Sequence, residues 1–312
     1  GDLAARRIAG KPYTVSEYNH PAPNQFAAEG MPMIAAVGAF QGWDGVYSFA
    51  YNHSDRPEPR RVDSFFDIKG DPAKLAHSAA CSAIFLRGDV KTGTVKVFGW
   101  MPRDAERKKL HQALNAWGLK TGVDEREAIV HWVGIALGDT APPMAHVAPF
   151  PADQKVFASD TGEIRWDVSE EGAGCFTVSA PRSKLFTGFV RGRTFDLGGG
   201  VSLAIGKTAL DWATVTMTCI EGEGFDKPGR ILIAATGDIH NKGAKLRDLG
   251  GNRVTLGNQW GEEPVMCEGV PAEIALPVSP DRVKLYPLDQ SGNRREAVPV
   301  AAKDGKTVLK LG

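Results

Sequence analysis

The sequence predicts an α+β, mostly β protein, in which a strand–helix segment precedes an antiparallel β-sandwich. Three observations support this fold class. The first hundred residues alternate apolar strand and helix patterns. Short strand-like runs separated by turn residues follow from about residue 156 onward. The 36 glycines and 20 prolines among 312 residues favour many turns, and therefore many short strands.

The N-terminal region contains two strand–helix units. Residues 11–18 are predicted as a strand and residues 25–41 as a buried helix rich in Ala and Met. Residues 46–51 are predicted as a second strand, apolar enough to be buried on both faces. Residues 71–86 are predicted as a helix, because an Asp in the N-cap position is followed by a Pro in the first turn. This order, with long loops after the strands, indicates parallel βα units.

The region that follows is less regular. Residues 92–100 are predicted as a strand. Residues 103–117 have the apolar spacing of a helix that stops at a glycine. Residues 127–137 are apolar and fit either a helix or a strand, and we favour the strand.

Residues 138–154 contain four prolines and are predicted to be a linker. The linker separates residues 1–137 from a β-sandwich domain over residues 155–312. The predicted strands of that domain are residues 163–166, 175–178, 184–189, 213–218, 230–235, 272–276, 282–286 and 307–311.

Charge and hydropathy exclude several classes of partner. Lys and Arg number 37 and so do Asp and Glu, and a neutral chain lacks the basic face that binds nucleic acid or an anionic membrane surface. No apolar run reaches the roughly 18 residues that span a bilayer. We therefore expect neither a nucleic acid nor a membrane as partner. The sequence does not specify the cellular location of the protein. Secretion, or export to a periplasm, directed by a signal outside this segment is one alternative.

Cysteine and histidine spacings do not indicate a metal site. Cys81, Cys175, Cys219 and Cys267 are far apart and form no C-x-x-C pair, so we expect unpaired thiols. One disulfide in the C-terminal half is the alternative if the protein is secreted. The histidines lack a ligand spacing such as H-E-x-x-H. We expect no metal and no other cofactor.

The most informative polar stretch surrounds Glu17. This carboxylate lies at the C-terminal end of a predicted parallel strand, where the active sites of α/β proteins are found. Its neighbours Tyr18, Asn19, His20 and Asn24 offer the aromatic and polar groups that bind polyols. The alternative is a structural Glu that pairs with an Arg or caps a helix, and spacing alone does not decide between the two.

The second predicted strand ends in a similar stretch, which contains Tyr51 and His53. Two parallel strands would bring these residues to the same face as Glu17, which favours a functional interpretation. Trp43 and Asp44 precede the second strand. We therefore expect Trp43 to be a core residue and Asp44 to be a turn or cap residue.

These residues carry a resemblance to a known family. The run Gly-Lys-Pro-Tyr-Thr-Val-Ser-Glu-Tyr at residues 10–18 resembles the seventh strand of retaining (β/α)8-barrel glycoside hydrolases, the clan of cellulases and β-galactosidases. Residues 42–51 are similar to the eighth strand, and residues 71–87 to the closing helix. The region from Phe157 onward looks like the C-terminal β-sandwich of a subgroup. The resemblance implies an incomplete (β/α) barrel segment followed by an antiparallel β-sandwich.

The resemblance implies that Glu17 is the nucleophile of a glycosidase that acts on a carbohydrate substrate. Such an enzyme needs a second carboxylic acid about 5–5.5 Å away. In this clan that acid follows an Asn on the fourth strand, and the sequence contains no Asn-Glu dipeptide. A complete barrel takes about 250 residues, so we expect the acid/base from outside this segment. The residues expected to contact or support the sugar are Tyr18, Asn19, His20, Asn24, Tyr51 and His53.

Two lone parallel strands would leave edges and an apolar face open. We therefore expect a homo-oligomer or a companion chain that completes the barrel. A second interpretation is a non-catalytic carbohydrate-binding or accessory β-sandwich module. A third is another hydrolase, such as an esterase, whose site forms on oligomerisation.

Several sandwich residues carry weaker signals. Trp166 and Trp212 are expected in the core, whereas Trp260 is the candidate for an exposed ring that stacks on a sugar. Residues 238–241 are predicted to form a turn rather than a ligand site. His77 lies within a predicted helix and is expected to be structural.

Overall fold

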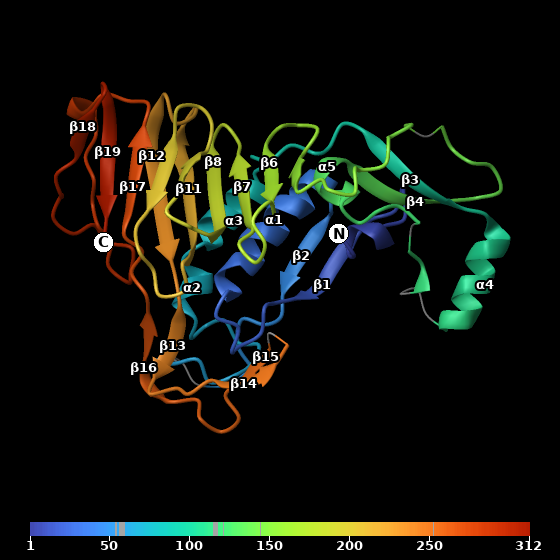
Figure 1. Cartoon of the computed structure of the whole chain (residues 1–312), viewed down its shortest axis with the longest axis horizontal. Coiled ribbons are helices and arrows are strands. Elements are labelled where there is room, and N and C mark those ends of the chain that lie inside the picture. The colour runs from blue at the N-terminus through green and yellow to red at the C-terminus, as the bar shows by residue number, and fades with distance from the viewer. Residues whose placement is uncertain (54, 56–59, 115–117, 121, 144, 252) are drawn as a thin grey trace.

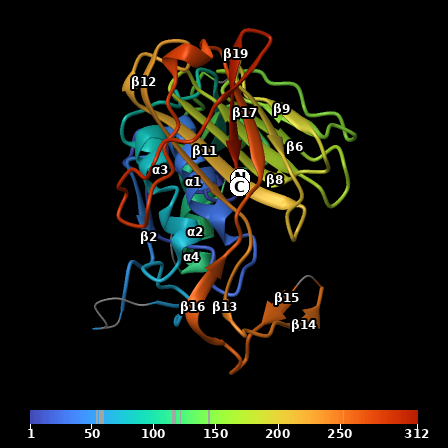
Figure 2. The ribbon, with the colours of Figure 1, turned by 90° about the vertical axis from the view of Figure 1, so that its left-hand side faces the viewer.

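The structure, a computed structural model, describes residues 1–53, 55, 60–114, 118–120, 122–143, 145–251 and 253–312. It is mostly β, and its large sheets are antiparallel, as predicted (Figure 1). Two large sheets occupy the second half of the chain. Helices of the first half lie on one side of these sheets (Figure 2), and a small parallel pair of strands lies beside the helices.

The first half contains helices and two parallel strand pairs. Its elements are η1 (Ala4–Arg6), β1 (Thr14–Tyr18), η2 (Ala27–Glu29), α1 (Gly30–Gln41), β2 (Gly45–Ser48), α2 (Pro72–Leu75), α3 (Ser78–Phe85), β3 (Lys96–Met101), α4 (Arg103–Ala113), α5 (Glu127–Val130) and β4 (Trp132–Leu137). β1 pairs with β2 in parallel, which confirms the predicted parallel βα unit, and β3 pairs with β4 in parallel.

Several predicted boundaries differ from the observed ones. The predicted helix over residues 71–86 is interrupted, because α2 ends at Leu75 and α3 begins at Ser78. Its N-cap is confirmed, since a carboxylate oxygen of Asp71 accepts a hydrogen bond from the backbone N–H of Lys74 at 3.0 Å. The predicted strand over residues 127–137 begins with the short helix α5 and becomes β4 only at Trp132.

Two further differences concern strands and helix ends. The helix predicted over residues 103–117 ends at Ala113, and residues 115–117 lie outside the described part of the chain. The strand predicted over residues 282–286 is absent there and is replaced by the 3₁₀ helix η4 (Pro280–Arg282) and an isolated bridge at Leu285.

The second strand, β2, is not buried on both faces as predicted. α1 packs against one face of the β1–β2 pair, where Val15 is buried next to Ile34. The other face carries Thr14 and Tyr47, and Tyr47 is 60% exposed. The apolar sequence of the second strand predicted that both faces would be buried, but the face with Tyr47 is exposed in the part of the chain that the structure describes.

The second half forms the predicted antiparallel sandwich. One sheet has the order β12-β11-β8-β7-β6-β5, with β5 (Val156–Ala158), β6 (Ile164–Asp167), β7 (Cys175–Ser179), β8 (Ser183–Phe189), β11 (Trp212–Gly222) and β12 (Pro228–Thr236). The other has the order β18-β19-β17-β10-β9, with β9 (Thr194–Asp196), β10 (Ser202–Ile205), β17 (Ala272–Leu276), β18 (Ala301–Lys303) and β19 (Lys306–Leu311).

Two narrow ribbons extend from the sandwich. β13 (Ile239–Lys242) pairs with β16 (Glu262–Cys267), and β14 (Arg247–Gly250) pairs with β15 (Arg253–Thr255), both antiparallel. Figures 1 and 2 show both ribbons below the two large sheets.

The six-stranded sheet is covered on both faces. Phe186 belongs to a core that also contains Leu203 and Ile274 of the five-stranded sheet. Phe176, on the opposite face, belongs to a second core with Phe40 of α1. Burial of these apolar side chains on both faces stabilises the layered arrangement.

Candidate functional site

The pairing of β1 with β2 is irregular at Glu17. Val15 and Tyr18 are aligned with β2, but the two residues between them stand opposite a single residue, Tyr47. These two residues, Ser16 and Glu17, are both exposed. An extra residue of this kind commonly redirects a side chain beside an active site. Glu17 is thus an exposed carboxylate at the carboxyl end of a parallel strand.

Tyr18 and His20 form a half-buried pair beside Glu29. The Tyr18 hydroxyl lies 3.1 Å from Nε2 of His20, and Nδ1 of His20 lies 3.9 Å from a Glu29 carboxylate oxygen. Burial raises the pKa of Tyr18 to about 12 and that of Glu29 to about 7. Burial, followed by the charge of Lys74, lowers the pKa of His20. The contact between Tyr18 and His20 supports the end of β1, whereas Nδ1 of His20 has no hydrogen-bond partner among the described residues.

Asn19 uses both ends of its side-chain amide within the protein. Its NH₂ group donates to the carbonyl oxygens of Phe49 at 2.8 Å and Phe66 at 2.6 Å. Its oxygen accepts a hydrogen bond from the Lys74 ammonium at 2.9 Å. Lys74 is itself buried and lies 3.6 Å from the Asp71 carboxylate. Asn19 therefore ties the end of β1 to the loops after β2 and to α2.

His53 and Tyr51 lie in the loop after β2. Nδ1 of His53 is 2.5 Å from the buried Asp67 carboxylate, which also accepts the His53 backbone N–H at 3.1 Å. Tyr51 is 59% exposed. Asp67 was not predicted, because nothing local in the sequence links it to His53, which lies 14 positions earlier.

Exposed aromatic rings gather at the carboxyl ends of β1 and β2. Besides Tyr47 and Tyr51, the rings of Phe65 and Phe66 are 52% and 42% exposed. The backbone N–H of Ala50 donates to the Phe66 carbonyl oxygen at 3.1 Å, and this bond joins the segment after β2 to the segment that contains the two phenylalanines. Sequence reasoning missed the two phenylalanines, because they lie in a polar loop without strand or helix periodicity.

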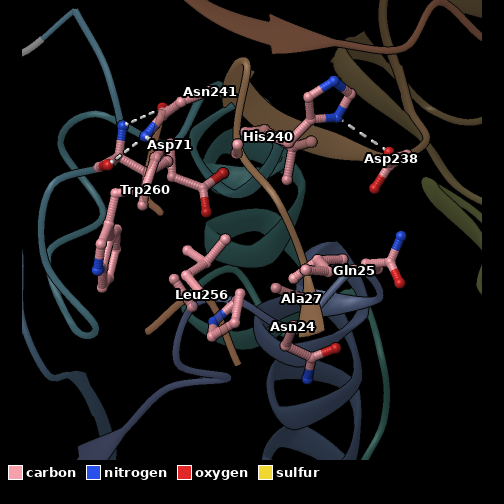
Figure 3. A pocket seen from close by; sticks show the side chains of 15 residues that line it. Asn24, Gln25, Ala27, Asp71, Asp238, His240, Asn241, Leu256 and Trp260 are labelled. Atoms are coloured by element: carbon pink, nitrogen blue, oxygen red, sulfur yellow. Dashed lines mark hydrogen bonds and ion pairs between the residues drawn. The ribbon is translucent and has the colours of Figure 1, made fainter. Parts of the chain in front are cut away.

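A cavity of about 220 Å³ lies between residues 22–27, which follow β1, and the part of the β13–β16 ribbon made by β13 and the segment after it, up to Trp260 (Figure 3). Asn24 lines it, but its side-chain oxygen accepts the Phe26 backbone N–H at 2.9 Å. Trp260, predicted as an exposed ring, is half-buried and lines the same cavity. Residues 238–241 were predicted as a turn, but β13 begins at Ile239, and all four residues line this cavity.

The other expected core residues differ in burial. Trp43 and Trp212 are buried, as predicted, and Trp166 is only half-buried at the edge of a core. The Asp44 carboxylate accepts the Tyr13 backbone N–H at 2.8 Å, so it links the residue before β2 to the residue before β1 rather than making the local bond of the predicted turn or cap. His77 is fully buried and structural, as predicted.

Neither a metal-binding cluster nor a membrane-spanning helix occurs in the part of the chain that the structure describes. No group of three or more His, Cys, Asp or Glu among these residues can hold a metal ion. No helix among them is long and apolar enough to cross a bilayer. All four cysteines are free thiols, so the alternative disulfide is not formed. No protein-family model, curated protein or solved structure matches the chain.

Proposed function

We propose that this chain is the C-terminal part of a retaining glycosidase, with Glu17 as the nucleophile and the acid/base supplied from outside this segment. The observation that carries the proposal is the exposed Glu17 carboxylate at the carboxyl end of β1, where the strand register is irregular. Catalytic groups of (β/α) barrels project from the carboxyl ends of parallel strands. The parallel β1–β2 pair with α1 as its crossover is compatible with two strands of such a barrel.

The proposed chemistry requires two carboxyl groups. The Glu17 carboxylate would attack the anomeric carbon, while the external acid protonates the departing oxygen and the glycosidic bond breaks. Water would then displace Glu17 from the covalent sugar, with the external group accepting the proton from that water. Asn19 supports this arrangement, because its hydrogen bonds fix the strand end next to Glu17.

The two-stranded β1–β2 sheet is the basis for a proposed partner. β1 and β2 form a two-stranded sheet, so each has an edge that pairs with no other strand among the described residues. The face with Tyr47 is also open. Because unpaired strand edges and open aromatic faces favour association, we propose that a second copy or a companion chain completes the barrel.

Covalent labelling tests the role of Glu17. A 2,4-dinitrophenyl 2-deoxy-2-fluoroglycoside has a leaving group that needs no protonation, so its reaction does not depend on the external acid. In the oligomer or complex that completes the barrel, we expect the peptide that contains Glu17 to gain the mass of one fluoroglycosyl group. The Glu17→Gln variant should gain none, and Glu170→Gln, which alters an exposed Glu elsewhere, should label normally.

Sedimentation of the same sample completes the test. An oligomer or a complex that labels at Glu17 supports the proposal. A monodisperse monomer that binds a sugar but does not label contradicts catalysis, and it favours the alternative of a non-catalytic carbohydrate-binding module.

A further inference from the structure

We infer that the cavity between residues 22–27 and the β13–β16 ribbon binds a single neutral pyranose ring, at a site separate from Glu17. The inference goes beyond the proposed function, because binding in this cavity requires no catalysis. Figure 3 shows Asp71, Asp238, His240 and Trp260 around the same space as Leu256 and Ala27. Aromatic, apolar and hydrogen-bond-accepting groups therefore meet at one place.

Trp260 supplies an aromatic wall whose orientation is fixed. Its indole N–H donates to the carbonyl oxygen of Gly257 at 3.1 Å. Its ring makes an edge contact with Phe65, with the ring centroids 5.0 Å apart. Its backbone carbonyl accepts a hydrogen bond from the Asn241 amide at 2.8 Å. A fixed indole loses little freedom on binding, and the C–H face of a sugar ring packs well on an aromatic plane.

Asp238 supplies a carboxylate acceptor at the wall of the cavity. One oxygen of its carboxylate lies 3.1 Å from Nδ1 of His240, whereas the other is buried without a hydrogen-bond partner. A carboxylate can only accept hydrogen bonds, and buried polar atoms in proteins are normally paired. The buried oxygen has almost no accessible surface, so a sugar hydroxyl would donate to the oxygen beside His240, which keeps a second lone pair.

The charge of the lining selects against anions. Asp71 and Asp238 both line the cavity, and among its described lining residues none is Lys or Arg. A phosphate or a carboxylate ligand would meet these two carboxylates, and the Lys74 ammonium beside Asp71 is buried in an ion pair with it. A neutral polyol, in contrast, can donate hydroxyl hydrogens to these carboxylates and place its C–H surface on Trp260 and Leu256.

The cavity also limits the size of the ligand. Its volume of about 220 Å³ is smaller than the roughly 300–1,000 Å³ of pockets that hold drug-sized molecules. We therefore expect one sugar ring to enter, and any further rings of an oligosaccharide to extend into solvent.

Titration calorimetry with the whole 312-residue chain tests the inference. The probes are the methyl β-pyranosides of glucose, galactose, mannose and xylose, with glucosamine as a cationic probe and glucuronate as an anionic one. We expect saturable binding of at least one neutral pyranoside and none of glucuronate. Absence of binding for all four neutral probes, or binding of glucosamine alone, would overturn the inference.

Substitutions assign the binding to this cavity. Trp260→Ala should weaken binding at least roughly tenfold, because the stacking surface is lost. Asp238→Asn should weaken it several-fold, because the acceptor beside His240 loses its charge. Trp260→Phe keeps an aromatic face and should retain part of the affinity. If the alanine variant does not fold, the reduced affinity of this variant tests the role of Trp260 instead.

Two controls separate this site from other parts of the chain. Trp100 is a matched tryptophan on β3, 41% exposed, whose indole N–H donates to the Gly138 carbonyl at 3.0 Å, and Trp100→Ala should leave binding unchanged. Glu17→Gln should also bind normally, so a failure of catalysis at Glu17 leaves this inference intact. Equal affinity of Trp260→Ala and the unmodified chain would overturn it.

Discussion

The six-stranded sheet and the β1–β2 pair differ in how many of their faces are covered. Phe186 is buried between the two sandwich sheets, and Phe176 on the opposite face is buried against α1 and its neighbours. Tyr47 on β2 is largely exposed. Three or more strands with covered faces are stable on their own, whereas an isolated strand pair is marginal. The difference indicates that the six-stranded sheet holds the chain together and that the β1–β2 pair depends on its neighbours.

Strand β11 shows how both faces of the sheet can be buried. Val215 and Met217 face the five-stranded sheet, whereas Thr216 faces the helices. His77 lies between the layers, and its two ring nitrogens are 3.0 Å from the Thr216 hydroxyl and 2.8 Å from that of Thr236. His77 thus satisfies the hydroxyls of Thr216 and Thr236, and the Thr214 hydroxyl pairs with that of Thr187 at 2.7 Å, so these polar groups are buried with partners.

The largest expected effect is at Phe186. Phe186→Ala should lower the free energy of unfolding by about 3–5 kcal/mol, because it removes a buried ring and leaves a cavity between the sheets. Chemical denaturation at neutral pH measures this change. A loss below about 1 kcal/mol would contradict the idea that the covered sheet holds the chain together.

His77 tests the polar contact between the helices and the covered sheet. Burial lowers the pKa of His77 to about 4, so the unfolded chain takes up a proton between about pH 6.5 and pH 4 that the folded chain does not. The stability that neutral His77 contributes is therefore present above pH 6.5 and is lost as the pH falls to 4. His77→Ala should cost about 3 kcal/mol at pH 7 and almost nothing at pH 4.

Denaturation curves of both proteins from pH 4 to pH 8 measure this difference. A cost of the substitution that does not change with pH would contradict the buried neutral state of His77.

Glu29 gives the opposite pH dependence near β1. Burial raises its pKa to about 7, so the folded chain holds a proton between about pH 4.5 and pH 7 that the unfolded chain has released. Stability then falls as the pH rises through this window. Glu29→Gln should be more stable than the unmodified chain by up to about 3 kcal/mol at pH 8, and equally stable at pH 4.

The matched control is Glu170→Gln, which alters an exposed carboxylate and should leave stability unchanged at both pH values. If Glu29→Gln destabilised the protein at pH 8, the charged carboxylate would be a net stabilising partner of His20, contrary to the expected burial effect.

The smallest effect is expected on the open face. Tyr47→Ala should change the free energy of unfolding of the isolated chain by no more than about 0.5 kcal/mol, because the ring is exposed. The same substitution should weaken the proposed association, which sedimentation at several concentrations measures. A large loss of stability without any change in association would show that the open face is already covered within the chain.

Local patterns predicted the elements that local interactions fix. The cap at Asp71 depends on a bond to the N–H three residues later, and it was found where it was predicted. The parallel order of β1 and β2 follows from the helix between them. In contrast, residues 239–241 of the predicted turn belong to β13, because they pair with β16. That partner lies more than 20 residues later in the chain, so no local pattern indicates the pairing.

The sequence by itself determined that β1 carries Glu17 at its end, that the second half is an antiparallel sandwich, and that Trp212 is buried. Alternating side chains and turn residues specify these features, because both act over a few positions. Only the tertiary structure decided that β2 has an open face and that Trp260 meets Asp238 in a cavity. These features arise where segments distant in sequence pack together, and no local pattern specifies which segments meet.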